Sequence, residues 1–167
     1  TMMTTVLNEM WQSANMALAD GLMLTQGAVD AIEHHGTDVQ KALFLPKLIS
    51  GKWAGTMNLT EPNAGSDVGA LRTKAVPENG AYRITGTKIF ITHGDQDMSE
   101  NVVHLVLART PDAPAGVKGI SLFLVPKFLI NDDGSLGPRN DLRVVSLEHK
   151  LGHMASPTAV MSYGDDE

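Results

Sequence analysis

The sequence predicts an α+β fold in which a short N-terminal helical segment leads into an antiparallel β-barrel of about eight strands. Two observations support this prediction. Apolar residues recur every three or four positions up to residue 52, and from residue 53 they fall in short β-rich runs separated by turns. A chain of 167 residues is long enough for one compact core. We therefore expect two parts, residues 1–52 and residues 53–167.

The helical part is predicted from its apolar stripes and from the residues that end them. One stripe precedes Gly21, which is expected to end the first helix, and a second stripe stops at Gly36. Thr37 and Gln40 form a capping-box pattern that begins another helix, and Pro46 is expected to interrupt it. Residues 46–50 are expected to form one more helical turn, closed by Gly51. Because these helices lack a full core of their own, we expect them to pack against something larger.

The β part is predicted from eight short runs, each bounded by turn residues. They are residues 53–60, 71–76, 81–85, 88–92, 102–109, 120–126, 142–148 and 158–163. Asn79 and Gly80 are typical of a tight hairpin turn, and Gly86 indicates another reversal of the chain. Residues 110–119 and 131–141 are rich in Pro, Gly, Asn and Asp and are expected to be surface loops.

The composition excludes several classes of function. Thirteen Lys and Arg against nineteen Asp and Glu give a net charge of −6, which disfavours nucleic acid as a partner. The absence of Cys excludes disulfides, thiolate metal sites and cysteine nucleophiles, and no metal site is predicted from the His and acidic residues. No apolar run is long enough for a membrane span and no basic signal-peptide start is present, so a cytoplasmic location is expected.

Two segments carry candidate chemistry. Residues 56–67 end a strand and open a loop with Gly65 and Ser66, where backbone N–H groups and hydroxyls can bind an anion. The alternative is an ordinary strand-to-turn transition. Residues 86–94 form a strand with an aromatic residue at its middle, and the alternative is a core strand with Phe90 packed inside. The residues alone leave these alternatives open.

The two segments and a third one contain motifs that resemble those of one enzyme family. In chain order the motifs are Thr60-Glu61-Pro62-x-x-Gly65-Ser66-Asp67, Gly86-Thr87-Lys88-x-Phe90-Ile91-Thr92 and Lys150-Leu151-Gly152-x-x-x-Ser156-Pro157-Thr158. They resemble the signatures of the acyl-CoA dehydrogenase flavoprotein family. Residues 147–152 and the loop at 131–137 look most like the larger bacterial members of the 3-methylmercaptopropionyl-CoA dehydrogenase type.

The resemblance implies a domain organisation and a reaction. Residues 1–52 resemble the end of an N-terminal helical domain and residues 53–167 a middle β-barrel domain, while the family's C-terminal helical domain is absent. The family oxidises an acyl-CoA thioester to the 2,3-enoyl-CoA: a glutamate removes the α-proton, and the β-hydrogen leaves as hydride to N5 of FAD. That glutamate lies in the C-terminal domain, so no catalytic residue is predicted in this chain and the chain alone is expected to be inactive.

The resemblance also implies which residues contact the cofactor. They are Met57, Leu59, Thr60, Ser66, Phe90, Ile91 and Thr92, with Ser66 also implied to contact the substrate. Phe90 stands where the family most often has Trp, which keeps an aromatic face and loses an indole donor. Glu61 matches a structural glutamate of the first motif and is not expected to be catalytic.

The implied partners are an acyl-CoA substrate, an electron-transfer flavoprotein or similar acceptor, and further copies of the protein in a homo-oligomer. Two alternatives remain. One is an acyl-CoA oxidase of the same superfamily, because oxygen access depends on how closed the assembled site is. The other is a non-catalytic β-barrel module used for binding or assembly.

Overall fold

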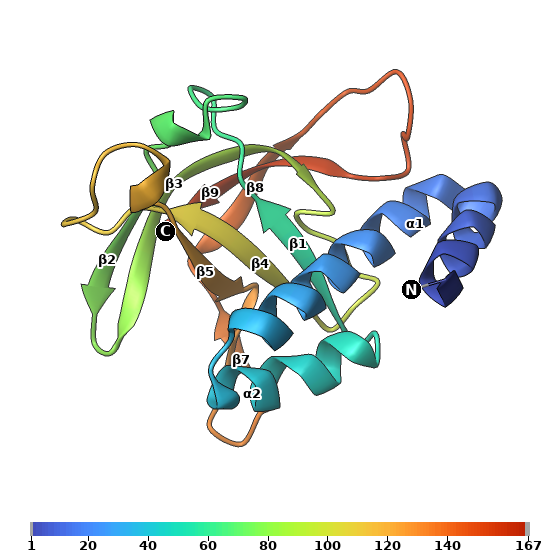
Figure 1. Ribbon diagram of the computed structural model, residues 1–167, viewed down its shortest axis with the longest axis horizontal. Coiled ribbons are helices and arrows are strands. Elements are labelled where there is room, and N and C mark those ends of the chain that lie inside the picture. Colours follow the sequence, from blue (N-terminus) through green and yellow to red (C-terminus); the bar gives the residue numbers. More distant parts are fainter. Residues whose placement is uncertain (1, 166–167) are drawn as a thin grey trace.

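A computed structural model describes residues 2–165 of the chain, in which two helices precede nine strands (Figure 1). The helices are α1 (Met2–His35) and α2 (Asp38–Ile49). The strands are β1 (Trp53–Asn58), β2 (Lys74–Glu78), β3 (Ala81–Thr92), β4 (Asn101–Ala108), β5 (Ser121–Pro126), β6 (Phe128–Ile130), β7 (Leu136–Arg139), β8 (Leu142–Leu147) and β9 (Thr158–Tyr163). Two short 3-10 turns, Val68–Ala70 and Val117–Gly119, lie in the connections.

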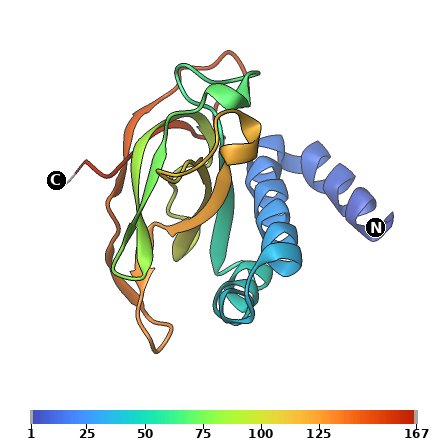
Figure 2. The ribbon, with the colours of Figure 1, turned by 60° about the vertical axis from the view of Figure 1, so that its left-hand side comes forward.

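The elements are arranged in layers. The strands of the described region form a three-stranded sheet β1-β4-β5, a four-stranded sheet β2-β3-β9-β8 and a small β6-β7 ribbon. Figure 2 shows both helices on one face of the three-stranded sheet and the four-stranded sheet beyond its other face. One apolar cluster, including Ile32, Phe44 and Trp53, lies between the helices and the first sheet. A second cluster, including Val106 and Met161, lies between the two sheets.

The α+β class is confirmed, whereas the closed antiparallel barrel is not found in residues 2–165. β1 and β4 run parallel, with Trp53 opposite Asn101 at one end and Asn58 opposite Val106 at the other. A parallel pair requires a long crossover, and the chain from residue 59 to residue 100 supplies one. Runs of β-forming residues do not specify strand direction, so the sequence pattern missed this pairing.

Helix α1 breaks at a different residue from the one predicted. Gly21 lies inside the helix, and the break is a kink at Asn15, whose backbone is extended at φ −158° and ψ 93°. The Asn15 side chain accepts a hydrogen bond from the N–H of Leu18 at 3.1 Å, as an N-cap does. The predicted stop at Gly36 is confirmed, because α1 ends at the preceding residue.

Helix α2 begins as predicted, but Pro46 does not interrupt it. Thr37 accepts from the N–H of Gln40 at 3.2 Å, and the Gln40 side chain accepts from the N–H of Thr37 at 2.9 Å, which completes the capping box. The predicted interruption at Pro46 is wrong, since the helix continues through it to Ile49. The helical turn predicted after Pro46 is confirmed, and Gly51 follows it with a positive φ of 73°. Burial of Phe44 and Leu48 on one face offsets the hydrogen bond that proline cannot donate.

Strand β3 is longer than predicted, because Gly86 does not reverse the chain. It marks instead the point where β3 changes partner: Thr85 pairs with Lys74 of β2, and Gly86 pairs with Tyr163 of β9. A Cβ at Gly86 would lie 2.6 Å from the Thr73 hydroxyl oxygen, so the glycine permits a close approach of two backbones.

The remaining turn and loop predictions have mixed outcomes. Asn79 and Gly80 form the hairpin turn, with positive φ values of 48° and 80°. The loop predicted at 131–141 contains β7, which pairs with β6, and the loop predicted at 110–119 contains a 3-10 turn. No helix within residues 2–165 has both the length and the apolar character that crossing a membrane requires.

Candidate functional site

The ends of β1 and β3 lie side by side, which brings together two of the sequence motifs. Three hydrogen bonds connect the segment 56–60 to the segment 88–92. They run from Thr56 Oγ1 to the Thr92 carbonyl at 2.6 Å, from Lys88 Nζ to the Leu59 carbonyl at 3.0 Å and from the Ile89 N–H to the Thr60 carbonyl at 2.9 Å. Six of the seven predicted cofactor residues lie in these segments. We call them the strand-end site: Met57, Leu59, Thr60, Phe90, Ile91 and Thr92.

A buried ion pair fixes this arrangement. The Glu61 Oε1 atom lies 2.8 Å from Lys88 Nζ and 2.6 Å from the Thr73 hydroxyl, and Oε2 accepts from the Arg72 N–H at 2.6 Å. Burial acts to raise the pKa of Glu61, but the hydrogen bonds from Lys88, Thr73 and the backbone outweigh it, so the pKa is lowered. Burial lowers the pKa of Lys88, and Glu61 opposes this effect. The carboxylate of Glu61 is engaged on both oxygens and anchors the loop.

Phe90 points away from the core because β3 has a bulge. The pairing of β3 with β9 shifts register between Lys88 and Ile91, and Phe90 has a positive φ of 58°. Lys88 and Ile91 are buried, while Phe90 is 58% exposed. The alternative of a core strand with Phe90 packed inside is therefore wrong. A left-handed backbone at an aromatic residue is uncommon, and strained residues of this kind cluster at active sites and ligand clamps.

The other members of the strand-end site differ in what they can offer to a ligand. Leu59, Thr60 and Thr92 are half-buried, so their side chains remain partly accessible. Met57 packs against the cluster beneath the helices, and the Ile91 side chain is only 2% exposed, within the core between the sheets. Ile91 can therefore offer a ligand its backbone but little of its side chain.

Ser66 lies beyond the strand-end site in the loop that follows Thr60. Glu61 and Ala64 exchange two backbone hydrogen bonds, of 2.9 and 3.1 Å, which form a tight turn. Asn63 Nδ2 donates to the carbonyl of Ala70 at 2.8 Å and ties the loop down. Ser66 follows this turn and is exposed, so its hydroxyl is available to a ligand.

Ser156 belongs to the third sequence motif, and no role was predicted for it. It is 1% exposed, and its hydroxyl has no hydrogen-bond partner within residues 2–165. It lines a pocket of about 340 Å³ together with Lys150, whose ammonium donates to the Ser156 carbonyl. A buried hydroxyl without a partner is costly, and a polar group of a bound molecule would satisfy it.

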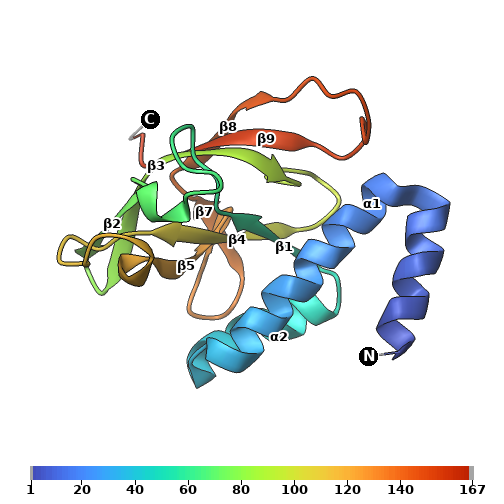
Figure 3. The same cartoon turned by 45° about the horizontal axis from the view of Figure 1, so that its top comes forward.

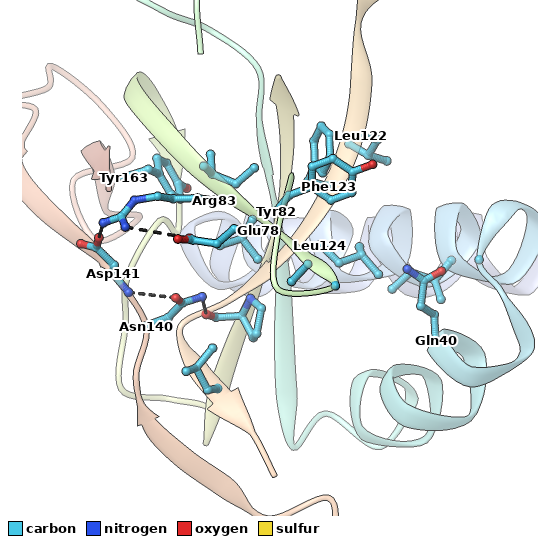
Figure 4. Close-up of a pocket in the computed structure, with 18 of the residues that line it drawn as sticks. Gln40, Glu78, Tyr82, Arg83, Leu122, Phe123, Leu124, Asn140, Asp141 and Tyr163 are labelled. Atoms are coloured by element: carbon cyan, nitrogen blue, oxygen red, sulfur yellow. Dashed lines mark hydrogen bonds and ion pairs between the residues drawn. The ribbon is translucent and has the colours of Figure 1, made fainter. Parts of the chain in front are cut away.

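A cleft larger than the Ser156 pocket lies elsewhere in the described part of the chain. It has a volume of about 860 Å³ and is lined by the end of α1, the β2–β3 hairpin and β5. Figure 4 shows the Arg83 side chain directed toward Glu78 and Asp141. The distances from its guanidinium nitrogens to the two carboxylates are 3.9 Å and 3.6 Å. No residue of the strand-end site lines this cleft. Ile84 lines it, and Ile84 and Phe90 are roughly 20 Å apart along β3 at the usual rise of a strand.

The exposed Phe90 ring and the half-buried residues Thr60 and Thr92 suit a flat aromatic ligand with a polar edge. Aromatic faces stack on such rings, and hydroxyls donate to or accept from the heteroatoms at their edges. An isoalloxazine ring has this chemistry, so the residues present are compatible with a flavin.

Comparisons with known proteins identify the family of this chain. Residues 56–165 match the family model described as acyl-CoA dehydrogenase, middle domain. The chain is 60% identical over 156 residues to a 3-methylmercaptopropionyl-CoA dehydrogenase of Ruegeria pomeroyi, a match that covers 93% of this chain and 26% of that protein.

Two solved structures are also similar. Butyryl-CoA dehydrogenase from Megasphaera elsdenii matches with a TM-score of 0.71 and 29% identity, over 90% of this chain and 36% of that one. A glutaryl-CoA dehydrogenase from Mycobacterium smegmatis in complex with FADH2 matches with a TM-score of 0.62 and 29% identity, over 82% of this chain and 30% of that one. The chain belongs to the acyl-CoA dehydrogenase family, and it spans 26% of the length of each of the first two curated relatives.

Proposed function

We propose that this chain is the FAD-contacting part of an acyl-CoA dehydrogenase that converts an acyl-CoA thioester into its 2,3-enoyl-CoA. The observation that carries the proposal is the outward-facing Phe90 ring at a β-bulge, held next to the end of β1. When bound, FAD supplies the acceptor for the hydride that leaves the β-carbon. The family relationship supports this assignment.

The proposed roles of the residues follow from their exposure. Phe90 offers its ring face to the flavin, while Thr60 and Thr92 offer hydroxyls to its polar edge. Met57 and Leu59 lie on either side of Asn58 and present the same face of the chain.

Two serines are available for the substrate or for the phosphate-bearing part of the cofactor. Ser66 is exposed in the loop after the strand-end site, and Ser156 has a buried hydroxyl without a partner in the described region. The chain orients the reactants, and the base that removes the α-proton is proposed to come from outside these 167 residues.

The wider biochemical setting is part of the same proposal. We expect an electron-transfer flavoprotein or a similar acceptor to reoxidise the flavin. Assembly into a homo-oligomer and a cytoplasmic location are also part of the proposal.

A chimera tests this function directly. The chain replaces its matched segment in the Ruegeria pomeroyi enzyme, which shares 60% identity with it. The purified chimera is titrated anaerobically with a panel of acyl-CoA thioesters while its visible spectrum is recorded. We expect a yellow protein whose flavin band bleaches with at least one thioester. A folded but colourless chimera, or a yellow one that no thioester bleaches, would contradict the proposal.

A further inference from the structure

The histidine that directly follows the strand-end site connects three parts of the molecule. His93 is buried, and its Nε2 atom lies 3.0 Å from the carbonyl oxygen of Ala17 in α1. Because a carbonyl only accepts, Nε2 carries the hydrogen in this contact. The backbone N–H of His93 donates to the carbonyl of Pro157 at 2.7 Å. One residue thus joins the end of β3 to a helix and to the loop before β9.

Helix α1 has a matching space for this imidazole. A Cβ at Gly21 would lie 3.2 Å from two atoms of the His93 ring and 3.3 Å from a third, closer than an ordinary van der Waals contact. Ala17 lies in the first turn after the kink at Asn15, where Figure 3 shows α1 changing direction. The ring therefore packs on α1 immediately after its kink.

A second histidine reaches the same turn of α1. His153, in the loop between β8 and β9, places Nδ1 2.9 Å from the Asp20 carboxylate. Figure 1 shows this loop extending toward α1. His93 and His153 both have left-handed backbones, at φ 52° and 50°. Residues other than glycine seldom adopt this conformation unless surrounding contacts hold them in it.

The strand-end site depends on how firmly the end of β3 is held. On one side, the Thr92 carbonyl accepts from the Thr56 hydroxyl at 2.6 Å. On the other side, the next residue, His93, is bonded to α1. Phe90 precedes Thr92 by two residues and sits at a bulge, where the regular strand pairing is interrupted. Contacts other than the β3–β9 backbone hydrogen bonds must therefore hold the chain at Phe90 in place.

We infer that His93 is a positioning residue, whose imidazole locks the end of β3 against α1 and thereby orients Phe90 and Thr92 toward the cofactor. The inference rests on the proposed function for the identity of the ligand. His93 transfers no proton in this role. Two properties of the imidazole hold the end of β3 against α1. Its Nε2–H group donates to the Ala17 carbonyl, and its ring fills the space next to Gly21.

The test introduces two glycine substitutions separately into the chimera, and each replaces a residue that has a left-handed backbone. His93→Gly removes the ring and relieves the left-handed φ, and Asn79→Gly relieves a similar φ of 48° in the distant β2–β3 turn. We expect His93→Gly to weaken FAD binding by about tenfold and to shift the reduction potential of the bound flavin. Asn79→Gly should leave both unchanged. A His93→Gly chimera with the FAD affinity and flavin potential of its parent would overturn the inference.

A second pair of variants decides the matter if His93→Gly does not fold. His93→Gln keeps an N–H donor on a flexible side chain, and His93→Met has a similar length without a donor. We expect the Gln variant to retain FAD affinity and the Met variant to lose it, and equal affinities would overturn the inference.

A further readout separates this inference from the proposed function. If the parent chimera binds no FAD, the proposed function fails. Amide hydrogen exchange of residues 16–21 then still reports whether His93→Gly releases α1, as the positioning contact requires. Unchanged exchange in that variant would overturn the contact itself.

Discussion

Protonation of His104 is expected to destabilise the fold as the pH falls below neutrality. This histidine is fully buried in β4, and its Nδ1 atom lies 3.3 Å from both Asn58 Nδ2 and the Tyr163 hydroxyl. Tyr163 donates to Asn58 Oδ1 at 2.7 Å, so Asn58 Nδ2 is the donor that faces the imidazole. The Nε2 atom of His104 has no partner within residues 2–165. A charged imidazole would therefore be poorly solvated here.

The magnitude follows from the pKa. Burial lowers the pKa of His104 from 6.5 to about 3, with a smaller opposing effect of Asp95 and smaller lowering effects of Lys127 and Arg139. Between these two pKa values the unfolded chain binds a proton that the folded chain does not, so stability falls as the pH falls. At about 1.4 kcal/mol per pH unit, acidification from pH 6.5 to pH 5 costs roughly 2 kcal/mol.

The assay is urea unfolding followed by tryptophan fluorescence at pH 7 and pH 5. The parent chain is compared with His104→Phe, which keeps an aromatic ring in β4 and removes the titrating group. We expect the parent to lose about 2 kcal/mol more of its unfolding free energy than the variant over this interval. The same pH dependence in both proteins would refute the reasoning.

Three substitutions test other parts of the packing, each by its effect on the urea midpoint. Gly55→Ala should destabilise by about 1–3 kcal/mol, because its Cβ would lie 2.4 Å from a Cβ of α1, whereas Gly27→Ala, with open space around it, should not. Lys88→Met should cost about 3–5 kcal/mol by leaving the Glu61 carboxylate buried without its cation, and adding Glu61→Gln should recover part of the loss. Thr37→Ala should cost about 1 kcal/mol through loss of the capping box. Destabilisation by Gly27→Ala, or no destabilisation by Gly55→Ala, Lys88→Met or Thr37→Ala, would contradict these assignments.

Features that depend on neighbouring residues were predictable from the sequence, and features that depend on distant contacts were not. The capping box of Thr37 and Gln40 involves residues three apart and was predicted correctly. Gly21 was expected to end a helix, but it lies inside α1. Its missing side chain leaves room for the ring of His93, which directly follows β3 and is 72 positions later in the sequence. Pro46 was expected to interrupt α2 before one more helical turn, yet burial of Phe44 and Leu48 sustains a continuous helix.

The same distinction applies to the candidate site. The motifs indicated the family, which the comparisons confirm, while their assignment of cofactor residues stays a prediction. The sequence did not reveal the bulge that turns Phe90 outward, because simple alternation along β3 places residue 90 on the same face as the buried Lys88. Nor did it reveal that the Ser156 hydroxyl is buried without a partner among residues 2–165, because its burial depends on the folded loop around it.

The central claim is that the strand-end site holds the flavin. The most direct test measures the FAD affinity of chimeras in which one of two exposed aromatic residues on β3 is replaced. Phe90 belongs to the strand-end site, and Tyr82, which is 49% exposed, lies near the other end of the strand. The account predicts that Phe90→Ala weakens FAD binding by about tenfold, while Phe90→Trp and Tyr82→Ala leave it near the parent value. FAD binding by Phe90→Ala as tight as that of the parent, or an equal loss in Tyr82→Ala, would contradict the claim that the strand-end site holds the flavin.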